Sequence, residues 1–385
     1  CVYQLMKDHY SRYTPEKVEA ISGCPKETFL EISEIFTSTH KPDKVATILY
    51  AMGTTQHTVG VQNIRAYGIM QLLMGNIGLA GGGINAMRGE SNVQGSTDAG
   101  LLWDILPGYN PIPMASKHKN LEEYLKVTVP KTNDPMSVNW WQNRPKYLIS
   151  MLKAWFGDAA TKENDFCFDW IPKAAKPTPH IVLFEDMYAG KLSGGFLWGT
   201  NTVVGGPNSK KEAKALEKLD WLAAIDLWET DTSVYWKDNY KNVKTEVFLL
   251  PAASSVEKEG SITNSGRWAQ WRYKAMNPVG ESKSDLDIAD MIFKAVRELY
   301  QKEGGKFPDP IVKANWDYTP HGHHEADPSI VAKEINGYNW KTKKQVESFM
   351  DLKEDGSTAC GDWVYGGSYT EDGNMMKRRK SDEGP

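Results

Sequence analysis

Apolar positions along the chain switch between short continuous runs and helical spacing, a pattern typical of α/β domains. Residues 45–52 form a continuous apolar run that ends at Gly53, and the positions from Gln62 to Met74 then have helical spacing. A buried parallel strand followed by a helix produces this order. The sequence therefore predicts a doubly wound strand–loop–helix unit, and such sheets bind ligands in the loop at the strand's carboxyl end.

The same alternation returns in the second half of the chain. The pattern predicts a strand over 195–199, an amphipathic helix over 209–219, a strand over 221–225 that ends at Asp226, and a strand over 245–250 that stops at Pro251. Strands alternating with helices indicate a parallel sheet. We therefore expect a second α/β region with its own strand ends.

Capping residues and glycines mark where further helices begin and end. Helices are predicted over 15–21 and 26–38, with Thr14 as the first cap and Gly23 as a stop, and over 285–301 with Ser284 as cap. Short polar side chains before a helix and glycine after it are the usual boundary signals. Between them, residues 100–176 have weak periodicity, seven prolines and several tryptophans, which predicts an ordered but irregular insertion.

One segment resembles a transmembrane helix in length but not in composition. Residues 66–87 contain no charge in 22 positions, but they include six glycines together with Gln71, Asn76 and Asn85. Amides and glycines suit a buried helix and loop better than lipid. The sequence therefore predicts an intramolecular segment and no direct membrane span.

Composition and charge exclude several classes of protein. The chain has 40% hydrophobic and 24% charged residues, and 45 basic against 49 acidic side chains give a net charge of −4. These values are typical of a folded globular chain and offer no basic field for nucleic acid. The four cysteines form no Cys-x-x-Cys pair, so a zinc ribbon or a ferredoxin-type cluster within this chain is not expected.

Three short motifs are candidates for chemistry. Residues 321–325 (His-Gly-His-His-Glu) resemble a metal site, but they lack the i,i+4 spacing of helical ligands, and an exposed loop is the better interpretation. The glycines at 81–83 follow a helix and so do not form a Rossmann fingerprint. Arg88 stands in a glycine-containing polar loop, where its planar fork suits a carboxylate or phosphate, although a surface arginine closing a loop is the alternative.

Four ordered motifs resemble the molybdopterin oxidoreductases, and specifically the catalytic subunits of respiratory formate dehydrogenases. They occupy residues 50–58 (Tyr-Ala-Met-Gly-Thr-Thr-Gln-His-Thr), 73–78, 81–89 and 256–267. The resemblance extends over nearly the whole chain and includes the insertion at 157–164. It implies a fold of two doubly wound dinucleotide-binding α/β domains.

The resemblance also implies that the chain is an internal fragment of a longer subunit. In that family an amino-terminal region carries a [4Fe–4S] cluster and a selenocysteine or cysteine that ligates molybdenum or tungsten. The implied organisation is residues 1–92 as the end of the first α/β domain, 93–252 as the second with the insertion, and 253–385 as a region leading to a carboxyl-terminal domain.

Site residues follow from the family motifs. The family binds two molybdopterin guanine dinucleotides, and the resemblance implies that this chain contacts them through ten residues: Met52, Gly53, Gln56, Gly89, Glu90, Gly199, Asn201, Asp226, Lys258 and Asp285. For Lys258 and Asp285, a surface charge and a helix cap are the alternatives. No metal ligand is expected among the residues present.

Arg88 is the catalytic residue that the resemblance implies, because a bidentate guanidinium could hold both oxygens of formate. The implied reaction oxidises formate to carbon dioxide and passes electrons to iron–sulfur clusters. The implied partners are an iron–sulfur beta subunit, a cytochrome subunit and the rest of the same polypeptide, in the periplasm. A nitrate or sulfur-oxyanion reductase of the same superfamily, or a non-catalytic structural fragment, remains an alternative.

Overall fold

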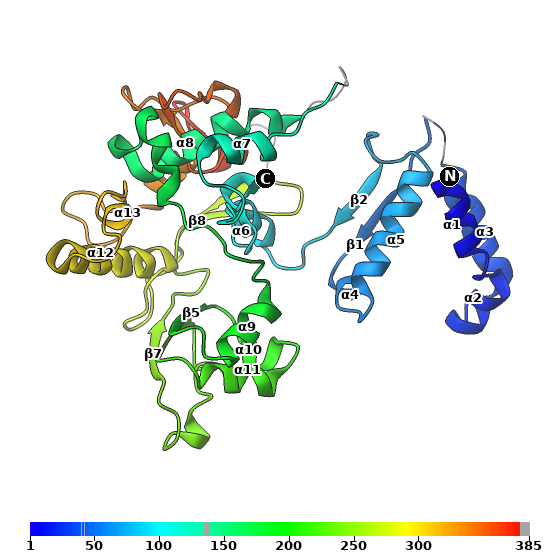
Figure 1. Ribbon diagram of the computed structural model, residues 1–385, viewed down its shortest axis with the longest axis horizontal. Helices are drawn as coiled ribbons and strands as arrows, with labels where there is room; N and C mark the ends of the chain where they lie inside the picture. Colours follow the sequence, from blue (N-terminus) through cyan, green and yellow to red (C-terminus); the bar gives the residue numbers. More distant parts are fainter. Residues whose placement is uncertain (40, 42, 134–138, 378–385) are drawn as a thin grey trace. The chain divides into compact units, whose positions relative to one another are not determined.

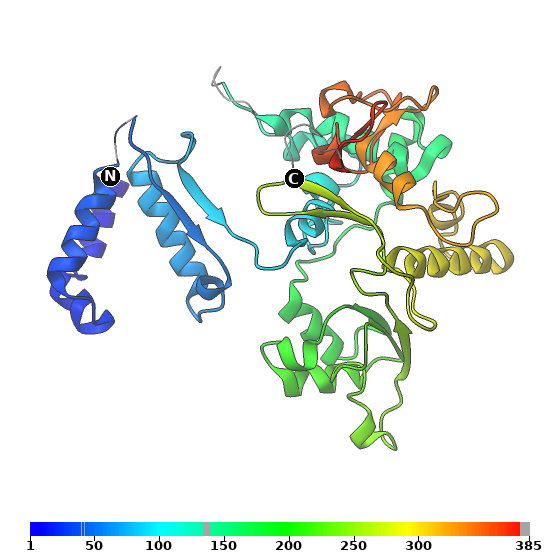
Figure 2. The ribbon, with the colours of Figure 1, turned by 180° about the vertical axis from the view of Figure 1, so that it is seen from behind.

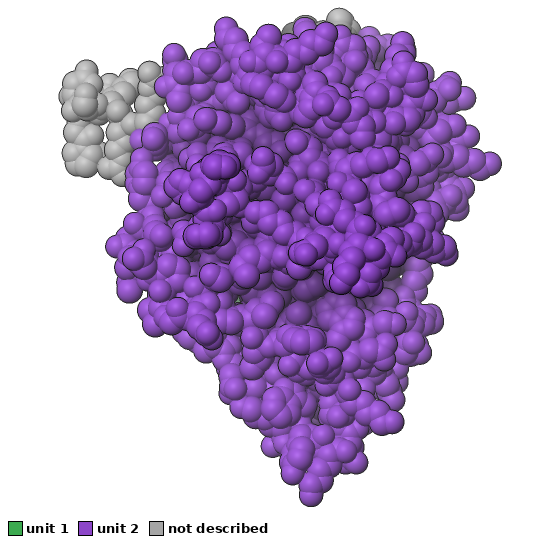
Figure 3. Space-filling model, turned by 90° about the vertical axis from the view of Figure 1, so that its left-hand side faces the viewer, with its two compact units in different colours: residues 1–93 green, residues 94–385 purple. Residues whose placement is uncertain are grey.

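The computed structural model describes residues 1–39, 41, 43–133 and 139–377, and the chain forms two compact units, Cys1–Val93 and Gln94–Pro385 (Figure 1). Figure 3 shows one face of the second unit in purple. The mixed α/β architecture confirms the predicted fold class.

The first unit begins with three helices, α1 (Val2–Tyr10), α2 (Pro15–Ser22) and α3 (Lys26–Thr37). The predicted caps are confirmed, since the Lys17 N–H donates to Thr14 Oγ1 at 3.3 Å and Gly23 adopts a φ of +73°. The left-handed conformation at Gly23 ends α2 where a residue with a Cβ would be strained.

A small parallel sheet completes the first unit. Strand β1 (Thr47–Tyr50) leads into α4 (Met52–Thr55) and α5 (Gly60–Leu73), and β2 (Gly83–Ala86) pairs in parallel with β1. The fully buried Gln71 joins helix and strands by donating to Ala46 O at 2.9 Å and Gly83 O at 2.6 Å, and Asn76 donates to Gln71 Oε1 at 2.8 Å. The amides that argued against a membrane span therefore fix α5 to the sheet.

Helix α5 and its following loop are present as predicted. The prediction that they are buried is wrong within this unit. Leu72, Leu73 and Ile77 are exposed, and only Gly60 and Gln71 of α5 are buried. Within the described residues, no helix is both long and apolar enough to cross a membrane.

The second unit contains the predicted parallel sheet, with β5 (Gly194–Trp198), β6 (Trp221–Asp226) and β7 (Glu246–Pro251) in that order. Helices α9 (His180–Tyr188), α10 (Thr202–Gly205) and α11 (Ser209–Leu216) belong to the same lobe (Figure 1). Phe184, Met187 and Leu216 pack on Leu222 of β6, whereas Ile288 of α12 (Asp285–Glu303) packs with Ala223 and Ile225. Because neighbouring residues of a strand face opposite sides, helices cover both faces of the sheet.

The segment expected to be an irregular insertion contains a long regular helix. Helices α7 (Leu121–Thr128) and α8 (Arg144–Phe156) pack with η4 (Lys162–Trp170) in a core that includes Leu148, Leu152 and Phe168. Trp155 and Trp170 pack against this core. Helix α8 is buried on nearly all sides, so it lacks the apolar–polar periodicity by which a surface helix is recognised.

The second unit also contains the antiparallel hairpin of β8 (Gly260–Thr263) and β9 (Ala269–Arg272), which Figure 2 shows from behind. Residues 321–325 form an exposed turn, as the sequence predicts. The other elements are α6 (Val93–Asp98), β3 (Ile105–Leu106), η1 (Pro107–Tyr109), β4 (Asn110–Pro111), η2 (Trp140–Asn143), η3 (Gly157–Ala159), η5 (Lys237–Asn239), α13 (Asp309–Val312), α14 (Pro328–Asn336), β10 (Tyr338–Asn339), η6 (Phe349–Asp351), β11 (Thr358–Ala359), η7 (Trp363–Tyr365), β12 (Tyr369–Thr370), β13 (Gly373–Asn374) and η8 (Met375–Lys377).

Candidate functional site

The first group of predicted site residues lies at one edge of the β1–β2 sheet. Because the strands are parallel, with Tyr50 opposite Ala86, both carboxyl ends meet at that edge. The Met87 N–H donates to Tyr50 O at 2.7 Å and extends the pairing one residue past β2. The loops after the two strands therefore start side by side.

The loop after β1 carries Met52, Gly53 and Gln56. Met52 and Gly53 open the short helix α4, and the Gln56 N–H donates to Met52 O at 2.9 Å. All three residues are exposed, and outside its chain neighbours and its own helix no heavy atom lies within 4 Å of the position that a Cβ on Gly53 would take. This backbone is therefore open to close approach by a ligand.

The loop after β2 carries Arg88, Gly89 and Glu90, all of them exposed. A Cβ on Gly89 would also have no heavy atom within 4 Å other than those of its chain neighbours. The guanidinium of Arg88 and the carboxylate of Glu90 thus follow the same sheet edge as Gln56. The structure brings these six predicted residues to one edge of the first unit, while their roles stay predictions.

The second group lies at the carboxyl edge of the β5–β6–β7 sheet. Gly199, with a φ of +59°, donates its N–H to Ile225 O at 2.8 Å and turns the chain out of β5. Asn201 then accepts hydrogen bonds from Thr232 Oγ1 at 2.7 Å and from the Thr232 N–H at 3.1 Å. Its amide nitrogen donates to Asp231 Oδ2 at 3.1 Å, so Asn201 joins the loops that follow β5 and β6.

Asp226 ends β6 and lines a pocket of about 350 Å³ with Trp228, Glu229, Pro251 and Glu281 among its walls. Its Oδ1 accepts the Leu227 N–H at 2.8 Å. A carboxylate held this way keeps an oxygen available for another donor. This is the strand-end position at which doubly wound sheets contact ligands.

Lys258 and Asp285 form an ion pair beside the same edge. Asp285 is the first residue of α12, after the Ser284 cap, and its Oδ1 accepts the Trp198 indole N–H at 2.6 Å. The carboxylate therefore links the end of β5 with the start of α12. The structure brings Lys258, Asp285 and Trp198 together, and the sequence did not single out Trp198.

The donors and acceptors of this second edge fit a guanine nucleotide. Guanine presents N–H groups that carboxylates such as Asp226 and Asp285 accept, and a ribose hydroxyl can do the same. Lys258 supplies a cation for a diphosphate. The chemistry of these side chains is therefore compatible with the dinucleotide that the sequence predicts.

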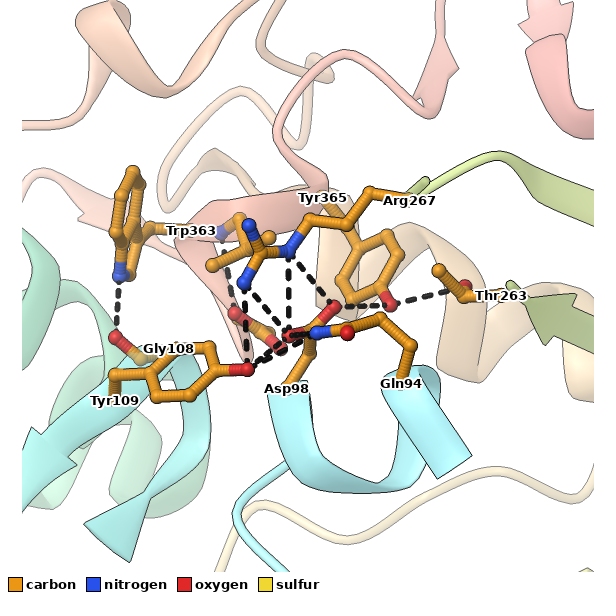
Figure 4. A network of polar contacts seen from close by, with 10 residues as sticks. Gln94, Asp98, Gly108, Tyr109, Thr263, Arg267, Trp363 and Tyr365 are labelled. Atoms are coloured by element: carbon orange, nitrogen blue, oxygen red, sulfur yellow. Dashed lines mark hydrogen bonds and ion pairs between the residues drawn. The ribbon is translucent and has the colours of Figure 1, made fainter. Parts of the chain in front are cut away.

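A buried polar network was not predicted from the sequence (Figure 4). The fully buried Asp98 of α6 accepts hydrogen bonds from Tyr109 OH at 2.6 Å, Gln94 Nε2 at 2.8 Å and Tyr365 OH at 3.0 Å. Arg267, in the β8–β9 hairpin loop, adds an ion pair with 3.3 Å between Nη2 and Asp98 Oδ1. The network ties α6, the hairpin and η7 together inside the second unit.

Asp362 is a second buried acid next to this network. The Val364 N–H donates to Asp362 Oδ1 at 3.1 Å, whereas Oδ2 is buried without a hydrogen-bond partner among the described residues. Burial, together with the negative charge of Asp98, raises the pKa of Asp362 to about 8. The carboxyl group therefore keeps its proton through most of the neutral range.

No sequence signal marks these buried acids, because each occurs singly in a polar loop or at the end of a short helix. Among the described residues, no group of three or more His, Cys, Asp or Glu side chains is arranged to hold a metal ion.

Comparison with known proteins gives a consistent family assignment. A family model described as Molybdopterin oxidoreductase matches residues 9–295. The alpha subunit of formate dehydrogenase 2 (cytochrome c-553) from Nitratidesulfovibrio vulgaris is 48% identical over 100% of this chain and 39% of its own length. The formate dehydrogenase alpha subunit of Megalodesulfovibrio gigas is 47% identical over 98% of this chain and 38% of its own length.

The nitrate-inducible formate dehydrogenase major subunit of Escherichia coli is 44% identical over 100% of this chain and 39% of its own length. The chain therefore spans about two-fifths of the length of these relatives. Among solved structures, acetylene hydratase from Pelobacter acetylenicus aligns with a TM-score of 0.43 and 17% identity, over 78% of this chain and 35% of that structure.

Proposed function

The chain belongs to the molybdopterin oxidoreductase family, and from that premise we propose that it is part of the catalytic subunit of a formate dehydrogenase. One observation carries the proposal: Arg88 follows β2 at the edge where the β1 loop presents Met52 and Gln56. A cation for a one-carbon carboxylate thus stands at the sheet edge proposed for the cofactor. The 44% to 48% identity to proteins named as formate dehydrogenase subunits supports the same substrate.

We propose that two molybdopterin guanine dinucleotides, holding molybdenum or tungsten, are bound at the two sheet edges. Met52, Gly53, Gln56, Gly89 and Glu90 would hold one of them. The other would be held by Gly199, Asn201, Asp226, Lys258 and Asp285. When bound, the metal and its pterins supply the two-electron redox chemistry.

The protein's own contribution to the reaction is to bind and orient formate through Arg88. A guanidinium donates two parallel N–H bonds to a carboxylate, so both formate oxygens would be fixed and the C–H bond aimed in one direction. The same contact neutralises the negative charge of the substrate. On oxidation to carbon dioxide this charge is lost, which weakens the contact and favours product release.

The remaining parts of the proposal concern the complete enzyme. Electrons would pass to a [4Fe–4S] cluster elsewhere in the polypeptide and then to an iron–sulfur beta subunit and a cytochrome subunit in the periplasm. We also propose domain boundaries near residues 92 and 252, with residues 253–385 as a connection to a further domain.

Substitution of Arg88 in the intact enzyme tests the proposed function. Arg88→Lys keeps the charge but loses the bidentate fork, and losing roughly 2.7 kcal/mol of transition-state stabilisation would lower kcat/KM for formate about a hundredfold. Arg88→Ala should have a larger effect, while the metal and pterin contents stay near normal. Formate oxidation kinetics and metal analysis measure both effects.

The matched control is Arg65→Ala, which removes an exposed arginine from α5 and should leave formate oxidation unchanged. A metal-replete Arg88→Ala enzyme with kcat/KM close to that of the wild type would refute the role of Arg88. Activity with nitrate or a sulfur oxyanion, and none with formate, would instead assign the chain to a sibling reductase.

A further inference from the structure

A polar pocket of about 670 Å³ lies in the second unit, away from the strand ends of the β5–β6–β7 sheet. Its walls come from α14, the segment before it, β10, β12 and the turn into β13. Its volume is in the range that holds small organic molecules. Its charged residues are Asp317, Lys333, Glu334, Lys343 and Glu371, and the phenols of Tyr318 and Tyr338 also line it.

Glu334 is the acid of this pocket on helix α14. The Tyr318 hydroxyl donates to Glu334 Oε1 at 2.9 Å. No lysine, arginine or histidine in the described part of the chain forms an ion pair with Glu334. Although Glu334 is partly exposed to the pocket, the protein around its carboxyl group raises its pKa to about 7 by desolvation.

The two lysines of the pocket face aromatic rings. Lys343 Nζ lies 3.5 Å from the centroid of the Trp340 ring, and Lys333 Nζ lies 5.3 Å from that of Tyr369. Each ammonium group thus has a cation–π partner. Glu371 Oε1 accepts the Gln345 N–H at 2.6 Å. Asp317 also lines the pocket, so three acids face two lysines and an ionised Glu334 leaves one uncompensated negative charge.

We propose that this pocket binds a small organic amine, whose alkylammonium group pairs with Glu334. An ammonium group has three N–H donors, so it can bond the Glu334 carboxylate and a tyrosine hydroxyl together. The ring of Tyr318 offers an additional π surface to the cation. Pairing supplies the counter-charge that the acid otherwise lacks, and binding then removes a proton from Glu334.

An anionic ligand is the competing possibility, because two lysines also line the pocket. An anion would have to draw Lys333 and Lys343 away from their aromatic partners, and it would leave Glu334 without a cation. The excess of acids over lysines therefore favours a cation, and probes of opposite sign separate the two possibilities.

Calorimetric titration of the intact enzyme with 1,4-diaminobutane, and separately with succinate, tests the proposal. The diamine should bind and succinate should not. Because the carboxylate must be ionised to pair, affinity for the diamine should rise about fiftyfold from pH 5 to pH 7 and level off above pH 8. Glu334→Gln should weaken diamine binding at least about tenfold at pH 8 and remove its pH dependence.

Glu354→Gln makes the same chemical change at an exposed acid outside the pocket and should leave binding unchanged. Tyr318→Phe provides a second measurement should Glu334→Gln fail to fold. Because the Tyr318 hydrogen bond lowers the pKa of Glu334, its loss should move the midpoint of the pH dependence upward. The proposal is overturned by absence of diamine binding, by succinate binding as tightly as the diamine, or by a Glu334→Gln or Tyr318→Phe variant that keeps the wild-type pH profile.

Discussion

Burial raises the pKa values of two carboxyl groups, Asp362 and Glu334, into the neutral range. The pKa of Asp362 is raised to about 8 and that of Glu334 to about 7. Glu334 faces a pocket, whereas Asp362 is enclosed, with Asp98 as a neighbouring charge. A ligand can therefore reach Glu334, while the proton on Asp362 influences folding.

Asp362 should make the second unit less stable as the pH rises. Its pKa in the folded chain, about 8, lies above its usual value of 3.8, so the folded state binds more protons between these two values. This contribution to stability is fully present below about pH 4 and is lost as the pH rises to about 8, at no more than about 1.4 kcal/mol per pH unit. Asp362→Asn should flatten the dependence, as measured by urea unfolding at pH 5, 6, 7 and 8.

The control for Asp362 is Asp372→Asn, which removes an exposed carboxylate and should leave the pH dependence as in the wild type. If the unfolding free energy of the Asp362→Asn variant changed with pH as steeply as that of the wild type, the proton would not be on Asp362.

The predicted site residues and the buried acids differ in what the sequence reveals about them. Asp226 and Gly199 were identifiable because each ends an apolar run, and the position of a strand end follows from the local pattern. Asp98 was not identifiable, because its burial depends on Arg267, which is 169 residues away in the chain. Local periodicity contains no information about such a partner.

At the scale of elements, strands and capped helices were predicted closely. The strand predicted over 221–225 and ending at Asp226 is β6, and the helix predicted over 285–301 is α12, extended by two residues. Helix α8 was missed because its surroundings, and not its sequence pattern, keep it buried. The helix over 62–74 was predicted, yet its exposure was not, because the pattern shows which residues are apolar and not what covers them.

The Asp98 network should hold three elements of the second unit together. Arg267→Gln removes the cation from the buried Asp98 and leaves the carboxylate with its three neutral donors. Breaking a buried pair costs about 3 to 5 kcal/mol, but half of the Arg267 side chain is exposed, so we expect about 2 kcal/mol of lost unfolding free energy. Urea unfolding followed by tryptophan fluorescence measures this change.

Arg272→Gln is the matched control, because Arg272 lies in β9 of the same hairpin and is exposed. Its unfolding free energy should stay within about 0.5 kcal/mol of the wild-type value. If Arg267→Gln also changes the unfolding free energy by less than about 0.5 kcal/mol, the ion pair does not anchor the hairpin.

At the scale of the whole molecule, the first unit exposes an unusual amount of apolar surface. Helices α1, α2 and α3 contain no fully buried residue, and Leu5, Ile32 and Ile35 are each more than half exposed. An amphipathic helix is normally stabilised by burying its apolar face against another element. Since the relatives are about two and a half times as long as this chain, we expect polypeptide outside this unit to cover these helices.

The isolated chain should therefore bind a hydrophobic dye such as 8-anilinonaphthalene-1-sulfonate several times more strongly, per mole, than the intact enzyme does. In the isolated chain, replacing Ile32 and Ile35 together with lysine should lower dye fluorescence without reducing helix content measured by circular dichroism, because both side chains are exposed there.

In the intact enzyme the same two substitutions should lower the free energy of unfolding by several kcal/mol, because each lysine would bring an unpaired charge into an apolar contact. As a matched control, replacing the exposed polar residues Glu31 and Glu34 with lysine should leave both the dye fluorescence of the isolated chain and the stability of the intact enzyme nearly unchanged. An intact enzyme that tolerates the isoleucine replacements would show that α3 remains exposed to solvent, and the apolar surface would then need a partner other than the enzyme's own polypeptide.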